Sequence, residues 1–354
     1  RLWKQSSGLM ARSVTQNAGD HGEHYITRDK KEYWAMFYSA AGGGVLIALM
    51  ALFKTYLGSI IDDKVWKGIA EGLNYGLGFM VIFMLHFTVA TKQPAMTAAR
   101  FAEAVEKTPQ GKTVNMKLAQ LLVDVFRSQS IAVLGNVLIA MGLAALIAFG
   151  YQYKTGEPLM NADQIAYQLH SIDPFAGTLW FAAIAGVWLF CSGIISGYFD
   201  NRSNYLNMRM RLTQHPLLKK LMSEKTRVKF ANYMHENYGS LIGNLCFGML
   251  LGITGVVGYL THLPLDIRHV AFSSANVGYI AVSGHFTYSL LLQCIAFVLL
   301  IGLVNLIVSF SLTLWVALRS LNAEIDSWWL IWHEVCQIVK KRPLSLFLPV
   351  QLDK

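Results

Sequence analysis

The stretch Tyr288–Leu318 reads YSLLLQCIAFVLLIGLVNLIVSFSLTLWVAL and contains no charged side chain. About 20 apolar residues in a helix are enough to cross the ~30 Å hydrocarbon core of a bilayer. The stretch therefore predicts a membrane-spanning helix, and its length allows the helix to tilt or to protrude from the bilayer.

The whole chain has the same apolar character. Of its 354 residues, 54% are hydrophobic and only 14% are charged, and the mean hydropathy is +0.39. About a quarter of the residues of soluble proteins are charged, and a water-soluble core of this size does not hide so much apolar surface. The composition excludes a soluble enzyme, a disordered chain and a secreted disulfide scaffold, and it predicts an all-α polytopic membrane protein.

Six stretches are long and apolar enough to cross a bilayer. We expect six transmembrane helices arranged as three hairpins, between a segment 1–32 and an interfacial tail 319–354, with the membrane domain at 33–318. The predicted spans are Tyr33–Leu57, Leu73–Thr91, Ile131–Tyr151, Pro174–Phe199, Gly239–Leu260 and Tyr288–Leu318.

The distribution of Lys and Arg predicts the topology. The N-terminal segment, the second and fourth loops and the tail together hold 25 Lys and Arg residues. The first, third and fifth loops together hold 4, and Lys54 lies inside the first span. Because basic residues concentrate on the cytoplasmic side, both termini are expected in the cytoplasm, for a protein of the bacterial inner membrane. The net charge of +9 then indicates contact with anionic lipid headgroups; other membrane proteins are possible partners, and nucleic acid is not expected.

Several segments outside the spans have amphipathic patterns or interfacial composition. These segments are Thr97–Lys107, Val114–Gln129, Asn201–Leu212, Leu217–Tyr238 and Ile325–Val339. They are expected to form helices: the second lies on the membrane surface or under the bundle, the third continues the fourth span up to a break near Pro216, and the last is an interfacial anchor. A weak repeat is also present, because Gly135-Asn136 and Gly243-Asn244 open the third and fifth spans in the same way. Internal repeats are common in transporters, although similar hairpins also occur without a transport role.

Polar side chains inside spans are costly and therefore functional candidates. His86, Asn136, Asn244 and Asn305 fall within predicted spans. Hydrogen bonding between helices is the favoured interpretation of His86, Asn136 and Asn244, and the absence of acidic residues well inside the spans disfavours an ion-driven pump. An intramembrane enzyme would need two catalytic groups at one depth, for which His86 and Asn305 are the available pair.

Two cytoplasmic motifs are candidate sites. Gln93 and Pro94 end the second span, and Asp200, Asn201 and Arg202 end the fourth. These five residues are candidates for contact with a ligand headgroup, although pairing with other loops is the favoured interpretation of Asp200 and Arg202. The two Ser-Gly pairs before Asp200, at positions 192–193 and 196–197, favour close helix packing.

A third motif has the residue types of a metal site. His21, Glu23 and His24 are weak candidate metal ligands, although a segment packed on the bundle is the favoured interpretation. The four cysteines are scattered without CxxC spacing, and no nucleotide-binding, hydrolase or zinc-protease motif occurs. We predict no cofactor, no metal and no catalytic residue.

Several runs are highly particular: Leu73–Gly76, His86–Thr88, Ala90–Ala99, Gly22–Ile26, Ser196–Asn201 and Leu263–His269. Together they resemble a proteobacterial family catalogued as "site-specific recombinase, Gcr type", from about Gly22 to Leu344. The resemblance implies DNA cleavage and rejoining, and a longer cytoplasmic region upstream of Arg1. A tyrosine recombinase needs a His-x-x-Arg pair, and none of the ten histidines is followed by Arg three positions later.

Three functions therefore stand as hypotheses. The first is handling of a lipid or small amphipathic ligand, or scaffolding of a membrane complex, with the site at the cytoplasmic ends of the second and fourth spans. The second is site-specific DNA recombination, and the third is intramembrane catalysis.

Overall fold

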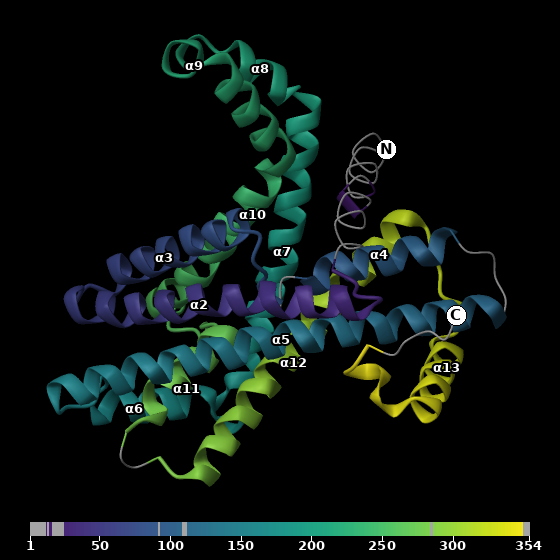
Figure 1. The fold of residues 1–354 in the computed structure, drawn as a ribbon. Coiled ribbons are helices and arrows are strands. Elements are labelled where there is room, and N and C mark those ends of the chain that lie inside the picture. Colours follow the sequence, from purple (N-terminus) through teal and green to yellow (C-terminus); the bar gives the residue numbers. More distant parts are fainter. Residues whose placement is uncertain are drawn as a thin grey trace.

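The computed structural model describes residues 12, 14–15, 25–90, 93–107, 112–283 and 286–349, and it gives only the backbone for residues 93–95, 107 and 112–114. Every regular element in these ranges is a helix (Figure 1). The α-helices are α2 Lys30–Ile60, α3 Lys64–Met84, α4 Gln93–Lys107, α5 Lys112–Thr155, α6 Ala162–Ile172, α7 Thr178–Tyr205, α8 Met208–Gln214, α9 Pro216–Leu221, α10 Glu224–Thr261, α11 Val270–Ala281, α12 Tyr288–Leu321 and α13 Trp328–Lys341, and two short 3₁₀ turns lie at Pro174–Ala176 and Pro343–Leu346.

Five helices of the described chain are long and apolar enough to cross a membrane: α2, α5, α7, α10 and α12. They coincide with five of the six predicted spans. The exception is the predicted span Leu73–Thr91, which overlaps α3. This helix begins earlier, because Asp63 caps its N-terminus, and it ends at Met84. Its first turns carry Lys64, Lys67 and Glu71, so its apolar part is shorter than the predicted span, and the sixth span stays a prediction.

Other boundaries also differ from the predicted ones. The surface helix expected at Val114–Gln129 is the first part of the single helix α5, because no proline or glycine separates it from the apolar stretch that follows. The segment expected as one helix over Asn201–Leu212 is divided, since α7 ends at Tyr205 and α8 starts after Asn207, which has left-handed backbone geometry.

The helix α11 was not predicted. It has twelve residues, ten of which are buried, and it packs against α5 and α12. An apolar helix of this length cannot span a bilayer, and such stretches are more often buried inside a bundle or re-entrant. The sequence signal was present in the apolar run Val270–Ala281, but it was too short to be counted as a span.

The helices form two units with the same internal arrangement. In the first unit α2 runs parallel to α5 and antiparallel to α3; in the second, α7 runs parallel to α12 and antiparallel to α10. The contacts that set these directions are Ala40–Gly135, Gly44–Ala140, Met50–Asn74 and Lys54–Glu71 in the first unit, and Ala182–Asn305, Gly186–Val308, Trp188–Thr254 and Ser203–His235 in the second. The short fourth helices are exchanged, because α4 packs on α12 and α11 packs on α5.

The two units meet where α3 crosses α10, at closely approaching backbones. A Cβ atom at Gly248 would collide with the backbone of Gly76, and one at Gly252 would collide with the backbone of Gly72. Because Gly248 meets Gly76 and Gly252 meets Gly72, α3 and α10 cross in antiparallel directions. These two helices hold the same place in their units, so the second unit is inverted relative to the first. Small residues four apart allow this close packing of helices in a membrane.

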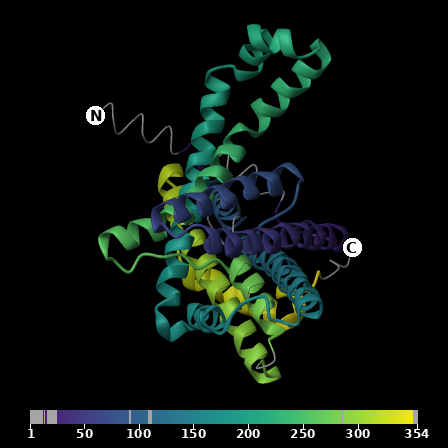
Figure 2. The ribbon, with the colours of Figure 1, turned by 90° about the vertical axis from the view of Figure 1, so that its left-hand side faces the viewer.

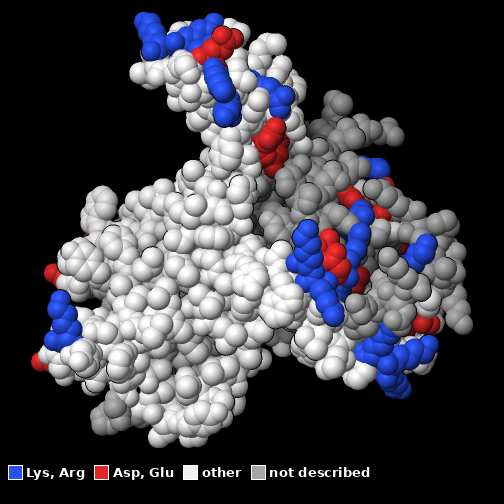
Figure 3. Space-filling model, viewed as in Figure 1, with Lys and Arg blue, Asp and Glu red and all other residues white. Residues whose placement is uncertain are grey.

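The body of the molecule is largely apolar on the face seen in Figure 3. Charged side chains gather at three places: the tip of the α2–α3 hairpin, the arm formed by α8 and α9, and the region of α4, α5 and α13. A broad face without Lys, Arg, Asp or Glu lies between them. The α8–α9 arm projects away from the other helices in both views (Figures 1 and 2).

The crossing of α3 and α10 provides a test of the fold. We expect Gly252→Ala to lower the free energy of unfolding by about 1–3 kcal/mol, because the added methyl group separates two backbones in contact. The matched control is Gly142→Ala in α5, where an added Cβ meets nothing within 4 Å and helix propensity favours alanine by about 0.5–1 kcal/mol. Denaturant titration of both variants in detergent measures the difference; equal stabilities would contradict the crossing.

Candidate functional site

The chain between α3 and α4 is held by one buried asparagine. Asn136 in α5 accepts a hydrogen bond at Oδ1 from the Ala90 N–H (2.7 Å), and its Nδ2 donates to the Thr88 carbonyl (2.9 Å). The same Nδ2 donates to the carbonyl of Ala40 in α2. Asn136 has no exposed surface, so it supplies polar partners where the backbone is not helical.

A second buried asparagine holds the chain before α11 in the same way. Asn305 in α12 accepts from the Val270 N–H (3.1 Å) and donates to the carbonyls of Arg268 (2.9 Å) and Ala182 (2.7 Å). In both cases the asparagine binds the carbonyl of one residue and the N–H two residues later. We call these two sets of bonds the asparagine clamps.

The surroundings of the clamps also match. The carbonyl bound on the neighbouring helix belongs to an alanine, and a glycine follows four residues later: Ala40 and Gly44 in α2, Ala182 and Gly186 in α7. A Cβ at Gly44 would lie 2.9 Å from the backbone carbonyl oxygen of Asn136, and a Cβ at Gly186 would lie 3.1 Å from that of Asn305. The two clamps are therefore equivalent positions of the inverted units.

This equivalence corrects the predicted repeat. The sequence paired Asn136 with Asn244, because both follow a glycine at the start of a span. Asn244 is buried and donates to the Ser240 carbonyl of its own helix, whereas the role of Asn136 is repeated by Asn305. The expected hydrogen bond between helices is confirmed for Asn136, which binds α2, and it stays a prediction for Asn244.

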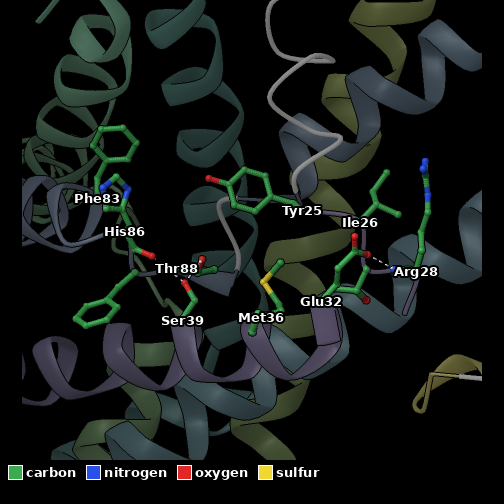
Figure 4. Close-up of a pocket in the computed structure, with 12 residues that line it drawn as sticks. Tyr25, Ile26, Arg28, Glu32, Met36, Ser39, Phe83, His86 and Thr88 are labelled. Carbon is green, nitrogen blue, oxygen red and sulfur yellow. Dashed lines mark hydrogen bonds between the residues drawn. The ribbon is translucent and has the colours of Figure 1, made fainter. Parts of the chain in front are cut away.

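A pocket of about 490 Å³ lies beside the first clamp, where α2 starts and α3 ends (Figure 4). The Ser39 hydroxyl lies within hydrogen-bond distance of the His86 carbonyl (3.0 Å) and of Thr88 Oγ1 (2.9 Å), and these contacts fix the wall of the pocket. Tyr25, Met36 and Phe83 also line it. We refer to it as the Ser39 pocket.

A larger pocket of about 610 Å³ lies at the opposite end of the α2–α3 hairpin, beside the second clamp. The segment Asp266–His269 forms one wall, and the last turns of α2 with the first turns of α3 form another. Between Ser39 and Thr55, which line the two pockets, α2 rises roughly 24 Å at 1.5 Å per residue. We refer to this second cavity as the Arg268 pocket.

Positive charge is in excess in the Arg268 pocket, which is lined by four basic and three acidic side chains. Arg268 pairs with Asp266 at 2.6 Å and donates to the Ser171 carbonyl, and Lys54 lies 3.7 Å from Glu71. The remaining basic residues are Lys64, whose ammonium group lies 4.3 Å from the centre of the Tyr259 ring, and Lys67; neither belongs to an ion pair found in the described chain. The remaining acid is Asp163.

The structure shows a contact for one of the predicted ligand-binding residues, Asp200. Asp200 accepts a hydrogen bond from the Gly239 N–H (2.9 Å), and Ser203, one turn later, donates to the His235 carbonyl. His235 and Gly239 are four residues apart in α10, and in a regular helix the Gly239 N–H donates to the His235 carbonyl. Asp200 and Ser203 of α7 therefore bind the donor and the acceptor of one helical hydrogen bond in α10. The structure thus gives Asp200 a contact between helices, and a role in ligand binding stays a prediction for it, for Asn201 and for Arg202.

Other predicted residues lie outside what is described. The side chains of Gln93 and Pro94 are not described, and neither are His21, Glu23 and His24, so these sites stay predictions. Within the described residues, no three His, Cys, Asp or Glu side chains form a group that could hold a metal ion. The close packing predicted for the Ser-Gly pairs is confirmed, because a Cβ at Gly243 of α10 would lie 2.9 Å from the Cβ of Ser196.

His86 and Asn305 do not form the pair that intramembrane catalysis would need. α3 ends before His86, which is exposed, has positive φ and lines the Ser39 pocket. Asn305 is fully buried in the second clamp, at the end of the bundle where the Arg268 pocket lies. The structure therefore does not bring the two residues together, and the place of His86 inside a span stays a prediction.

Sequence reasoning missed the Arg268 pocket. Two signals were present: Lys54 was the one basic residue inside a predicted span, and Leu263–His269 was one of the particular runs. They are more than 200 residues apart, and only the packing of α2 and α3 against α10 and the segment before α11 brings them to one cavity.

Comparison with known proteins gave one match. The family model described as "Site-specific recombinase" matches residues 1–349. No curated protein and no solved structure matches the chain.

The asparagine clamps yield a prediction about stability. Asn136→Ala and Asn305→Ala are each expected to cost about 2–4 kcal/mol, because each change leaves several buried backbone groups without their partner. The matched control is Asn74→Ala in α3, which removes one hydrogen bond, to the Met50 carbonyl, and should cost about 1 kcal/mol. Denaturant titration in detergent measures all three; a cost for Asn305→Ala no larger than that for Asn74→Ala would contradict the clamp.

Proposed function

The chain belongs to the site-specific recombinase family, and we propose that it is a bacterial inner-membrane protein that binds a small amphipathic molecule with an anionic headgroup in the Arg268 pocket. The observation that carries this proposal is a cavity of about 610 Å³ with basic side chains in excess on polar walls and aromatic side chains beside them. Cavities of about 300–1,000 Å³ are the usual size of small-ligand sites.

The basic side chains support an anionic headgroup. Lys64 and Lys67 face the cavity outside any ion pair found in the described chain, and Lys54 is only loosely paired with Glu71. Ammonium groups bind carboxylates and phosphates through charge-assisted hydrogen bonds, which are about twice as strong as neutral ones. A carboxylate and a phosphate headgroup are both compatible with these donors.

The apolar side of the pocket supports an amphipathic ligand. Tyr75 and Phe272 lie against each other with ring centres 4.5 Å apart, and Val256 and Ile267 are further lining residues. A ligand chain in contact with these side chains would place its headgroup near the lysines. Part of the ligand would then remain in an environment as apolar as the bilayer.

The charge distribution supports an orientation for this site. The Arg268 pocket lies at the tip of the α2–α3 hairpin, on the side with few basic residues in the predicted topology. By the positive-inside rule this side faces away from the cytoplasm, and both termini face the cytoplasm. The proposal thus moves the ligand site away from the cytoplasmic ends of the second and fourth predicted spans, where Asp200 contacts α10.

Binding of an amphipathic probe tests the proposal. NBD-labelled lysophosphatidate, which carries a phosphate, should bind the detergent-solubilised protein, and an NBD-labelled alkylamine should bind much more weakly. We expect Lys67→Gln to weaken lysophosphatidate binding about tenfold or more, since a charge-assisted hydrogen bond contributes about 1.5–3 kcal/mol.

The matched control is Lys154→Gln, which removes a positive charge at an exposed position next to the C-terminal end of α5. Lys154 does not line the pocket. Fluorescence titration measures the affinities. Equal affinity for both probes, or equal losses in the two variants, would refute an anion site in the Arg268 pocket. Binding unchanged in both variants would show that the probe binds elsewhere.

The family description favours a second candidate function, site-specific DNA recombination. That reaction joins a Tyr or Ser nucleophile covalently to a DNA phosphate. Incubation of the purified protein with supercoiled plasmid, followed by denaturation, would reveal such an adduct. An adduct would support recombination, whereas plasmid recovered intact together with saturable lysophosphatidate binding would favour the ligand-binding proposal.

A further inference from the structure

The Ser39 and Arg268 pockets are separated by a short column of aromatic side chains. Next to the Ser39 pocket lies a small cavity of about 30 Å³, and the two cavities share Tyr25, Phe83, Phe87 and Thr88. Phe79 lines the far side of the small cavity. The small cavity therefore adjoins both the Ser39 pocket and Phe79.

Phe79 is in turn one member of a buried aromatic cluster. Its ring centre lies 5.0 Å from Phe247, 5.8 Å from Phe272 and 6.3 Å from His269, and His269 lies within 6 Å of the other two. The exposed fraction of each of these side chains is 5% or less. His269 and Phe272 line the Arg268 pocket on the other side. We call these four residues the aromatic plug.

The plug lies among the elements that relate the two inverted units. Phe79 belongs to α3 and Phe247 to α10, the helices that cross at the glycine contacts, and His269 precedes Val270, the residue whose N–H the second clamp holds. The two pockets flank equivalent extended segments, one at each end of the bundle. Inverted repeats with interrupted helices and a site between the repeats are the architecture of many secondary transporters.

We propose that the two pockets are the two ends of one passage across the membrane, closed in this structure by the aromatic plug, and that an anionic amphipathic molecule crosses the membrane through it. This inference rests on the proposed function for the identity of the cargo. The passage itself rests on the cavities, the plug and the inverted repeat. In this arrangement the Arg268 pocket receives the headgroup on one side, and displacement of Phe79 connects it with the Ser39 pocket on the other.

Cysteine labelling tests the passage without any ligand. Cys191, Cys246, Cys294 and Cys336 are first replaced by serine or alanine, and reconstituted protein of known orientation is treated with a membrane-impermeant maleimide. Asn276→Cys, in the Arg268 pocket, should be labelled from the Arg268 side, and Ala35→Cys, in the Ser39 pocket, from the Ser39 side.

Opening of the plug is the decisive comparison. Adding Phe79→Ala should raise labelling of both cysteines from the previously closed side at least fivefold. The matched control is Phe149→Ala, which removes a phenylalanine that is 59% exposed on α5 and not part of the plug. Phe247→Ala opens the plug from α10 and serves as the second variant if Phe79→Ala does not give a monodisperse protein. Labelling confined to one side in the folded plug variants would overturn the passage.

Movement of the amphipathic probe tests the cargo. In proteoliposomes, NBD-labelled lysophosphatidate should change leaflets at least tenfold faster than in protein-free vesicles, as measured by dithionite quenching, and Lys67→Gln should slow this exchange. Binding without accelerated exchange would overturn the passage and leave the proposed function standing. Two-sided labelling of the plug variants without probe binding would support the passage and reject the proposed ligand class.

Discussion

The rest of the structure depends on the asparagine clamps. Wherever a chain leaves the helix inside an apolar bundle, its N–H and carbonyl groups lose their helical partners, and water is not there to replace them. A side-chain amide has two donors and one carbonyl acceptor. Asn136 and Asn305 use all of these groups, each satisfying one N–H and one carbonyl of an extended segment while binding a neighbouring helix. Without them, the breaks before α4 and α11 would have unpaired backbone groups.

A pocket also lies beside each of the two segments that the clamps hold, Thr88–Ala90 and Arg268–Val270. Because the two units are inverted, these pockets lie at opposite ends of the α2–α3 hairpin. The glycine contacts between α3 and α10 bring the units close enough for Phe79 and Phe247 to meet. Close backbone packing and a closed aromatic plug are thus consequences of the same crossing.

The candidate site shows how far reasoning from motifs reached. The run around Asp200 was chosen because its polar residues are dense at the end of a span, and the structure gives Asp200 a bond to the α10 backbone. Such a helix contact and a headgroup site have the same residue types, so sequence could not separate them. The basic side chains of the Arg268 pocket come from α2, α3 and the segment before α11, and no single stretch contains enough of them to form a motif.

By itself, the sequence determined the all-helical class, five of the helices apolar enough to cross a membrane, and the presence of polar residues such as Asn136 and Asn305 within them. These properties follow from local composition and from the length of a helix needed to cross a bilayer, so they can be read along the chain. Only the tertiary structure decided that α11 is a short buried helix, that Asn305 and not Asn244 repeats the role of Asn136, and that the two units are inverted. The physical reason is that these features depend on which backbone groups lack helical partners and on which distant side chains satisfy them.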